Sequence, residues 1–170
     1  TPPGATGGIG SEYVMRAAPD AYTLLVTSPD GTVKMLQGKG TDPVTQLTQI
    51  SMLASQPVTL SVGPKFKGNT LADFVAEARR APGTIAYASN GEGGATHYGM
   101  EIFAKQAGIR LNHIPYKGTA PALQDLVGGQ VEATLGSLQG AGAQLQSGRA
   151  RALAITSPRR VEAAPNIPTF

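Results

Sequence analysis

The chain has 170 residues, enough to bury a hydrophobic core, and its lack of cysteine excludes disulfides, thiolate metal sites and cysteine nucleophiles. Its formal net charge of +3 is too weak to indicate nucleic acid binding, and it has no tryptophan on which bases would stack. No apolar run approaches the length of a membrane span. The composition is compatible with a small acidic ligand.

The first fifty residues contain few regular elements. A glycine-rich stretch over residues 4–10 leads into a short helix predicted over 11–18. The apolar run over 22–27 predicts a strand, and Ser28-Pro29-Asp30-Gly31 is a turn sequence. The glycine-rich stretch is typical of the approach to a helix, but no strand precedes it. We therefore expect the chain to begin in the middle of a domain.

From residue 57 onward, strand patterns alternate with helix patterns. Strands are predicted over 58–62, 85–88, 111–114, 131–135 and 152–156. Helices are predicted over 70–80, 96–107, 119–127 and 138–145. Such alternation indicates an α/β fold with a parallel-rich sheet flanked by helices.

Several residues mark the ends of these helices. Thr70 and Asp73 have the spacing of a capping box, in which each side chain bonds the backbone of the other residue. Thr119 is the predicted N-cap of the helix over 119–127. Gly108 is expected to end the helix over 96–107, because glycine adopts the left-handed conformation found after many helices.

The most informative segment is the glycine-rich loop over residues 89–94, which opens onto the helix predicted from Thr96. The first amides of a helix lack intrahelical partners and carry partial positive charge, and glycines let a small anion approach the backbone. The sequence therefore predicts a site for a carboxylate or phosphate at residues 93–96. The loops over 115–118 and 136–138 also follow strands and are expected at the same edge of the sheet. An ordinary strand–helix connection is the alternative.

No catalytic motif accompanies this loop. The dinucleotide spacing is broken, because Thr96 stands where a third glycine is needed, and neither a nucleotide phosphate loop nor a Gly-x-Ser-x-Gly elbow occurs. We interpret His97 and His113 as structural, and they are too separated to indicate a metal site. Glu101 and Lys105 have the spacing of a solvent-facing pair. These patterns favour binding over catalysis. Acyl or phosphoryl chemistry in the region from Ser89 to His97 is the alternative.

Several stretches together resemble one family, the solute-binding receptors of tripartite tricarboxylate transporters, also called the Bug family. They occur in the order found in that family and together span essentially the whole chain. These stretches are Pro3–Gly10, Ala18–Leu25, Ser89–His97, His113–Leu123, Leu126–Val131 and Arg151–Ser157.

The resemblance implies a type II periplasmic-binding-protein-like fold, in which two α/β lobes close over a small carboxylate. Residues 1–55 would form part of lobe one without its first strand and ligand loop. Residues 56–156 would form the complete second lobe with its hinge strands, and 157–170 would begin the return to lobe one. A chain truncated at both ends is expected to bind ligand poorly and to dimerise through uncovered strand edges.

The resemblance also implies where the ligand binds. Lobe one would contribute Thr27, Ser28 and Asp30, and the hinge would contribute Gln56. Lobe two would contribute Ser89, Asn90, Gly93, Gly94, Ala95 and Thr96, with Gly136 and Ser137 at a rim where relatives often carry an aspartate–asparagine pair. No catalytic residue, metal or cofactor is implied.

The implied function is capture of a small organic anion in the periplasm and its delivery to membrane transporter subunits. The anion classes left open are dicarboxylates, tricarboxylates, amino acids and aromatic acids, and nucleic acid is not an expected partner. The alternative is a periplasmic sensing domain of the same fold that acts through a signalling partner.

Overall fold

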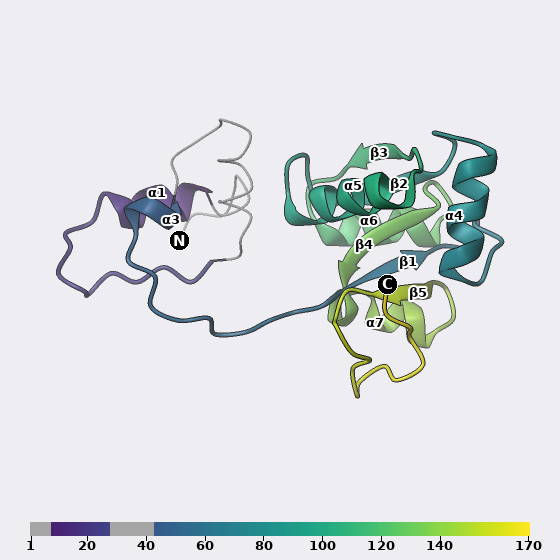
Figure 1. Cartoon of the computed structure of the whole chain (residues 1–170). Coiled ribbons are helices and arrows are strands. Elements are labelled where there is room, and N and C mark those ends of the chain that lie inside the picture. The colour runs from purple at the N-terminus through teal and green to yellow at the C-terminus, as the bar shows by residue number, and fades with distance from the viewer. Residues whose placement is uncertain (1–7, 28–42) are drawn as a thin grey trace. The chain divides into compact units, whose positions relative to one another are not determined.

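The computed structural model describes residues 8–27 and 43–170, and Figure 1 shows its elements. The chain divides into two compact units. The N-terminal unit comprises Thr1–Ala54 together with Gly93–Ala95, and the C-terminal unit comprises Ser55–Glu92 and Thr96–Phe170. Within the described ranges, no helix is long and apolar enough to cross a membrane.

The described part of the N-terminal unit contains two helices, α1 (Gly8–Met15) and α3 (Pro43–Gln46). Helix α1 begins and ends earlier than the predicted range 11–18. The strand predicted over 22–27 is wrong, because this segment is irregular. A strand needs a neighbouring strand to bond its backbone, and the described residues of this unit provide none.

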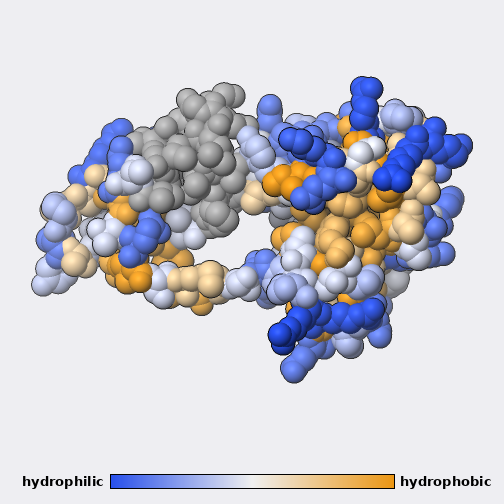
Figure 2. Space-filling model, viewed as in Figure 1, coloured by the Kyte–Doolittle hydropathy of each residue, from blue (hydrophilic) through white to orange (hydrophobic). Residues whose placement is uncertain are grey.

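Large apolar side chains are exposed on the N-terminal unit. Tyr22 is 92% exposed and Met52 is 82% exposed, and Figure 2 shows orange, hydrophobic atoms at the surface of this unit. These exposed side chains bear on the predicted dimerisation, which stays a prediction.

The C-terminal unit contains every strand and helix predicted after residue 57, with ends that differ from the predicted ones by at most two residues. Its strands are β1 (Val58–Val62), β2 (Ala86–Ser89), β3 (Asn112–Pro115), β4 (Ala133–Ser137) and β5 (Arg151–Ile155). Its helices are α4 (Leu71–Arg80), α5 (Ala95–Ala107), α6 (Thr119–Val127) and α7 (Leu138–Gln146).

The five strands form one sheet in the order β3-β2-β4-β1-β5. Strand β2 pairs in parallel with β3 and β4, whereas β1 is antiparallel to β4 and β5. Four strands therefore run in one direction, as a parallel-rich sheet requires, and β1 is the exception. The alternation of strands and helices did not indicate this reversal, because it encodes the type of each element and not its direction.

Helices cover both faces of this sheet (Figure 1). On one face, Phe74 of α4 and Met100 of α5 pack in a core cluster with Tyr87 of β2. On the other face, Leu126 of α6 packs in a second cluster with Ala88 of β2. Tyr87 and Ala88 belong to different clusters because neighbouring residues of a strand point to opposite faces. The predicted α/β fold with flanking helices is thus confirmed.

The chain enters and leaves the sheet at neighbouring positions. The backbone amide of Val58 donates to Oγ1 of Thr156 at 3.1 Å, and the amide of Thr156 donates to the carbonyl of Val58 at 2.9 Å. Residues 168–170 then run beside β5, where the amide of Ile155 donates to the carbonyl of Pro168 at 2.9 Å. The assignment of 157–170 to lobe one stays a prediction.

The predicted helix ends are confirmed in two cases and wrong in one. Gly108 follows α5 with a φ of 64°, and Thr70 caps α4 through the predicted box with Asp73. Thr119, however, is already the first helical residue of α6, and the N-cap is Gly118, which forms no side-chain cap bond. The φ of 112° at Gly118 suits glycine, whereas a threonine there would be strained.

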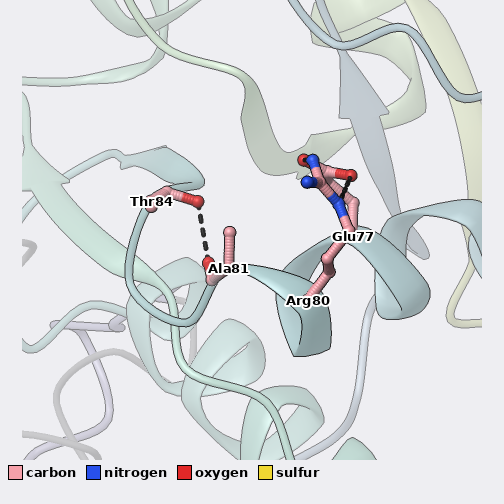
Figure 3. A network of polar contacts seen from close by, with 4 residues as sticks. All are labelled: Glu77, Arg80, Ala81 and Thr84. Carbon is pink, nitrogen blue, oxygen red and sulfur yellow. Dashed lines mark hydrogen bonds and ion pairs between the residues drawn. The ribbon is translucent and has the colours of Figure 1, made fainter.

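Both ends of α4 are fixed by short-range polar contacts. At the start, the amide of Asp73 donates to Oγ1 of Thr70 at 3.1 Å, and Oδ2 of Asp73 accepts from the amides of Asn69 and Thr70. These backbone bonds lower the pKa of the Asp73 carboxyl. At the end, Arg80 pairs with Glu77 at 2.6 Å, and Thr84 Oγ1 donates to the carbonyl of Ala81 (Figure 3).

Replacing Thr70 with alanine should lower the free energy of unfolding by about 1 kcal/mol, because the amide of Asp73 loses its acceptor. Urea unfolding followed by circular dichroism measures this loss. Thr70→Ser keeps the hydroxyl and should retain most of the stability. An equal loss in both variants would show that the methyl group, and not the cap, matters at this position.

Candidate functional site

The carboxyl ends of β2, β3 and β4 lie at one edge of the sheet, because these strands are parallel and adjacent. Helices α5, α6 and α7 follow these three strands. The start of β1 lies at the same edge, since β1 is antiparallel and Val58 pairs with Ser137. We call this edge the carboxyl edge.

The carboxyl edge brings together the predicted site residues of the C-terminal unit, although they are far apart in the sequence. Those residues are Gln56, Ser89, Asn90, Thr96, Gly136 and Ser137. Gly93 and Gly94 continue the loop after β2, and Ala95 is the first residue of α5. Thr27 is an exposed residue of the N-terminal unit, and Ser28 and Asp30 lie outside the described residues. Their roles in ligand binding stay predictions.

The hydroxyl of Thr96 closes the loop between β2 and α5. Its Oγ1 accepts a hydrogen bond from the amide of Asn90 at 3.2 Å and donates to Oδ1 of the same residue. Gly91 and Gly93 have φ angles of 144° and 72°, a region that favours glycine. The glycines and the Thr96 hydroxyl together hold the loop in one shape.

The side chain of Ser89 is buried and bonds the backbone of this loop. Its Oγ donates to the carbonyl of Gly91 at 3.1 Å and accepts from the amide of Gly91 at 3.3 Å. The Oγ atom also lies 2.7 Å from Nε2 of His113 on the neighbouring strand. The hydroxyl thus has three protein partners within hydrogen-bond distance.

A stack of three rings continues from this serine. The ring of His113 lies between Tyr87, with centroids 5.0 Å apart, and His97, with centroids 3.8 Å apart and an interplanar angle of 8°. Burial and, to a lesser extent, the neighbouring His97 lower the pKa of His113, because both disfavour the charged imidazolium. The structural role predicted for both histidines agrees with these contacts.

Glu101 has a different partner from the one its spacing indicates. The hydroxyl of Tyr87 donates to Oε1 of Glu101 at 2.6 Å, whereas no ion pair joins Glu101 to Lys105 in the described structure. Burial and the Glu101 carboxylate raise the pKa of the Tyr87 phenol. Helical spacing places Glu101 and Lys105 near each other, but it does not indicate a phenol reaching Glu101 from the sheet.

Ser137, at the end of β4, caps the start of helix α7. Oγ of Ser137 accepts from the amide of Gly140 at 3.0 Å, as an N-cap does in the first turn of a helix. A Cβ at Gly140 would lie 3.6 Å from Thr119, so the first turns of α6 and α7 are neighbours. A Cβ at Gly136 would meet no atom within 4 Å. The rim therefore has room beside Gly136.

The chemistry of this site is that of polar and backbone groups. Among the described residues, no group of histidine, aspartate and glutamate side chains could hold a metal ion. The helix starts provide partial positive charge, and negative groups are favoured there.

Comparison with known proteins gives this arrangement a family. The profile of the tripartite tricarboxylate transporter family receptor matches residues 1–170. Protein BugT of Bordetella pertussis is 34% identical over 98% of this chain and 52% of its own length. The chain thus spans about half the length of this curated relative.

Two solved structures have the same fold. R. palustris Rpa4515 with adipate is 30% identical with a TM-score of 0.87, over 98% of this chain and 57% of that protein. The periplasmic binding protein BugD is 32% identical with a TM-score of 0.83, over 98% of this chain and 56% of that protein. These likenesses confirm the predicted periplasmic-binding-protein fold.

The family match extends over every described element and over both glycine-rich segments that carried the resemblance. The chain belongs to the tripartite tricarboxylate transporter receptor family, whose curated relatives include the Bug proteins.

Proposed function

We propose that this chain captures a small carboxylate at the carboxyl edge, as part of a periplasmic solute-binding protein. The observation that carries the proposal is the loop between β2 and α5, which the Thr96 hydroxyl and two left-handed glycines hold at the start of a helix. A carboxylate is favoured there by the partial positive charge at the start of the helix. Asn90 and the residues 93–96 would contact it, with Gln56, Gly136 and Ser137 at the rim.

The relatives support the class of ligand and the type of partner. The solved structure of Rpa4515 contains adipate, a linear dicarboxylate. The matching family is named for transporter receptors, which favours delivery to membrane transporter subunits over the sensing alternative. The name of BugD supports a location in the periplasm. The tricarboxylate, amino acid and aromatic acid classes stay predictions.

Binding without catalysis is the activity that the side chains support. The Ser89 hydroxyl is buried and donates to the carbonyl of Gly91, so a nucleophilic role would require this bond to break. A general base in a triad needs a third group, commonly a carboxylate, that orients it. Among the described residues, the ring of His113 contacts Ser89 and two other rings, and no hydrogen bond joins it to a carboxylate. The matching family is described as a receptor family, which agrees with this proposal.

Binding is tested with adipate and with hexane-1,6-diol, which has the same length but no charge. Ligand-observed NMR detects weak binding, which suits a chain that spans half the length of its relatives. We expect a signal for adipate that salt weakens, and no signal for the diol. Equal signals for both compounds would overturn an anion site, and silence across dicarboxylates, tricarboxylates and amino acids would overturn the ligand class.

The loop itself is tested at Thr96. Thr96→Val removes the hydroxyl that bonds Asn90 but keeps the side-chain shape, so adipate affinity should fall about fivefold through loss of a hydrogen bond worth roughly 1 kcal/mol. Thr96→Ser keeps the hydroxyl and should bind like the parent chain. Unchanged affinity in the valine variant would exclude the closed loop from the site.

Dimerisation is also proposed, on the basis of the apolar side chains exposed on the N-terminal unit. Light scattering during size-exclusion chromatography measures the mass in solution. A monomer at all concentrations would contradict this part of the proposal.

A further inference from the structure

The rings of His97 and His113 stack on each other, and His113 contacts the loop proposed to bind the carboxylate through Ser89. Sixteen positions separate the two histidines in the sequence. His113 lies on β3, one of the two edge strands of the sheet, and His97 lies in the first turns of α5. Their ring centroids are 3.8 Å apart, and the two ring planes are nearly parallel. At this separation two imidazolium rings would repel each other with little water between them. The stack therefore accommodates one positive charge more easily than two.

His113 is joined directly to the loop through Ser89. Nε2 of His113 lies 2.7 Å from Oγ of Ser89, and this Oγ bonds both the amide and the carbonyl of Gly91. A displaced His113 ring would remove one of the partners that hold the buried hydroxyl in place. The position of the Gly91 backbone thus depends on the position of the His113 ring.

The charges around His113 come from three elements. His97 of α5 opposes a proton on His113, whereas Glu101 of α5 and Glu92 of the loop favour it. Tyr87 of β2 covers the other face of the ring and donates its hydroxyl to Glu101, which engages that carboxylate. Burial is the largest influence on the pKa of His113 and favours the neutral ring.

We propose that His113 is a positioning residue for the anion site, which holds the loop between β2 and α5 through Ser89 and releases it when the His113 ring takes up a proton. This inference rests on the proposed function, because it concerns the same loop. Acid should therefore open the loop and weaken carboxylate binding. Neutral pH should keep it closed.

The direction of the pH effect follows from linkage. The pKa of His113 is lowered in the closed loop, and in an opened loop it approaches the ordinary value of about 6.5. As the pH falls through this value, the open form binds a proton that the closed form does not, so opening becomes favourable. The effect is complete once the pH is below the pKa of the closed form.

Hydrogen exchange of the amides of Asn90 and Gly91, measured by NMR without any ligand, tests the proposal. Between about pH 8 and pH 5, protection in the parent chain should fall, by about tenfold for each unit between the two pKa values. In His113→Gln, which keeps a donor near Ser89 but does not titrate, protection should not change with pH. The amide of Leu60 in β1 serves as an internal control and should show no such change.

A second variant keeps the test decisive if the glutamine chain folds poorly. His97→Gln removes the neighbouring ring that disfavours a proton on His113, so the pKa of His113 in the closed loop should lie closer to that in the open loop. The loss of protection should then begin at the same pH as in the parent but be smaller. The same pH dependence in His113→Gln as in the parent, or no dependence in the parent across the titration of His113, would overturn the proposal. An unchanged profile in His97→Gln would remove His97 from it.

Adipate binding provides a separate outcome. The ratio of adipate affinities between the parent and His113→Gln should fall with acid, and protonation of adipate itself cancels in this ratio. If hydrogen exchange of the loop amides depends on pH but adipate does not bind, the positioning role of His113 is supported and the proposed function is contradicted. The two proposals can therefore fail independently.

Discussion

Replacing Gly63 with alanine should lower the free energy of unfolding of the C-terminal unit by about 3 kcal/mol, the upper part of the range for overpacked cores. Gly63 follows β1, and its amide donates to the carbonyl of Glu132 at 3.0 Å. A Cβ at this position would lie 2.1 Å from the carbonyl oxygen of Leu126. That oxygen belongs to the backbone of α6, so it cannot rotate away as a side chain would.

The matched control is Gly142→Ala in α7, where a Cβ would meet no atom within 4 Å. Alanine in a helix is favoured over glycine by roughly 0.5–1 kcal/mol, so this variant should be more stable than the parent. Urea unfolding of the three chains measures both effects, with similar slopes expected. A stable Gly63→Ala chain would mean that β1 and α6 do not approach as closely as the structure indicates.

Replacing Phe74 with alanine should cost about 3 to 5 kcal/mol, because a fully buried ring is removed from the larger core cluster. Phe74 lies on α4, and its ring packs against Phe66 at 5.5 Å and Phe103 at 6.3 Å between centroids. The loss combines two contributions: the hydrophobic free energy that burial of the ring provided, and the cost of the cavity that its removal leaves. Thermal unfolding by calorimetry measures it.

Phe74→Leu is the control for this second variant, because leucine fills much of the same space and should cost clearly less than alanine. The two variants together separate cavity size from the loss of aromatic contacts. If Phe74→Ala lost under about 1 kcal/mol, as surface substitutions commonly do, α4 would not pack on the sheet in solution.

The elements of the C-terminal unit could be predicted because their patterns are local. The alternation of Val58-Thr59-Leu60-Ser61-Val62 gives the bounds of β1, and the pair Thr70 and Asp73 gives the start of α4. Each pattern needs only neighbouring residues and one buried face. The same reasoning failed over 22–27, where an apolar run exists but the described chain offers no strand to pair with it.

The candidate site could be predicted only in part. The glycine-rich loop and the start of α5 are visible in the sequence, because glycines and a helix pattern adjoin. The contacts of Ser89 with His113, and of His113 with His97, depend on the parallel register of β2 and β3. Register joins residues that are distant in sequence, and neither histidine has a neighbour that indicates its partner. Side-chain roles therefore needed the structure.

The bonds between Val58 and Thr156 have an engineering consequence. Because the segment from β1 to β5 starts and finishes within hydrogen-bond distance, a short peptide could join its two ends with little loss of loop entropy. Closely spaced ends are also what domain insertion and circular permutation require. This segment is thus suited to transplantation into a host protein, or to opening at a surface turn such as that at Gly83, where a Cβ would meet no atom within 4 Å.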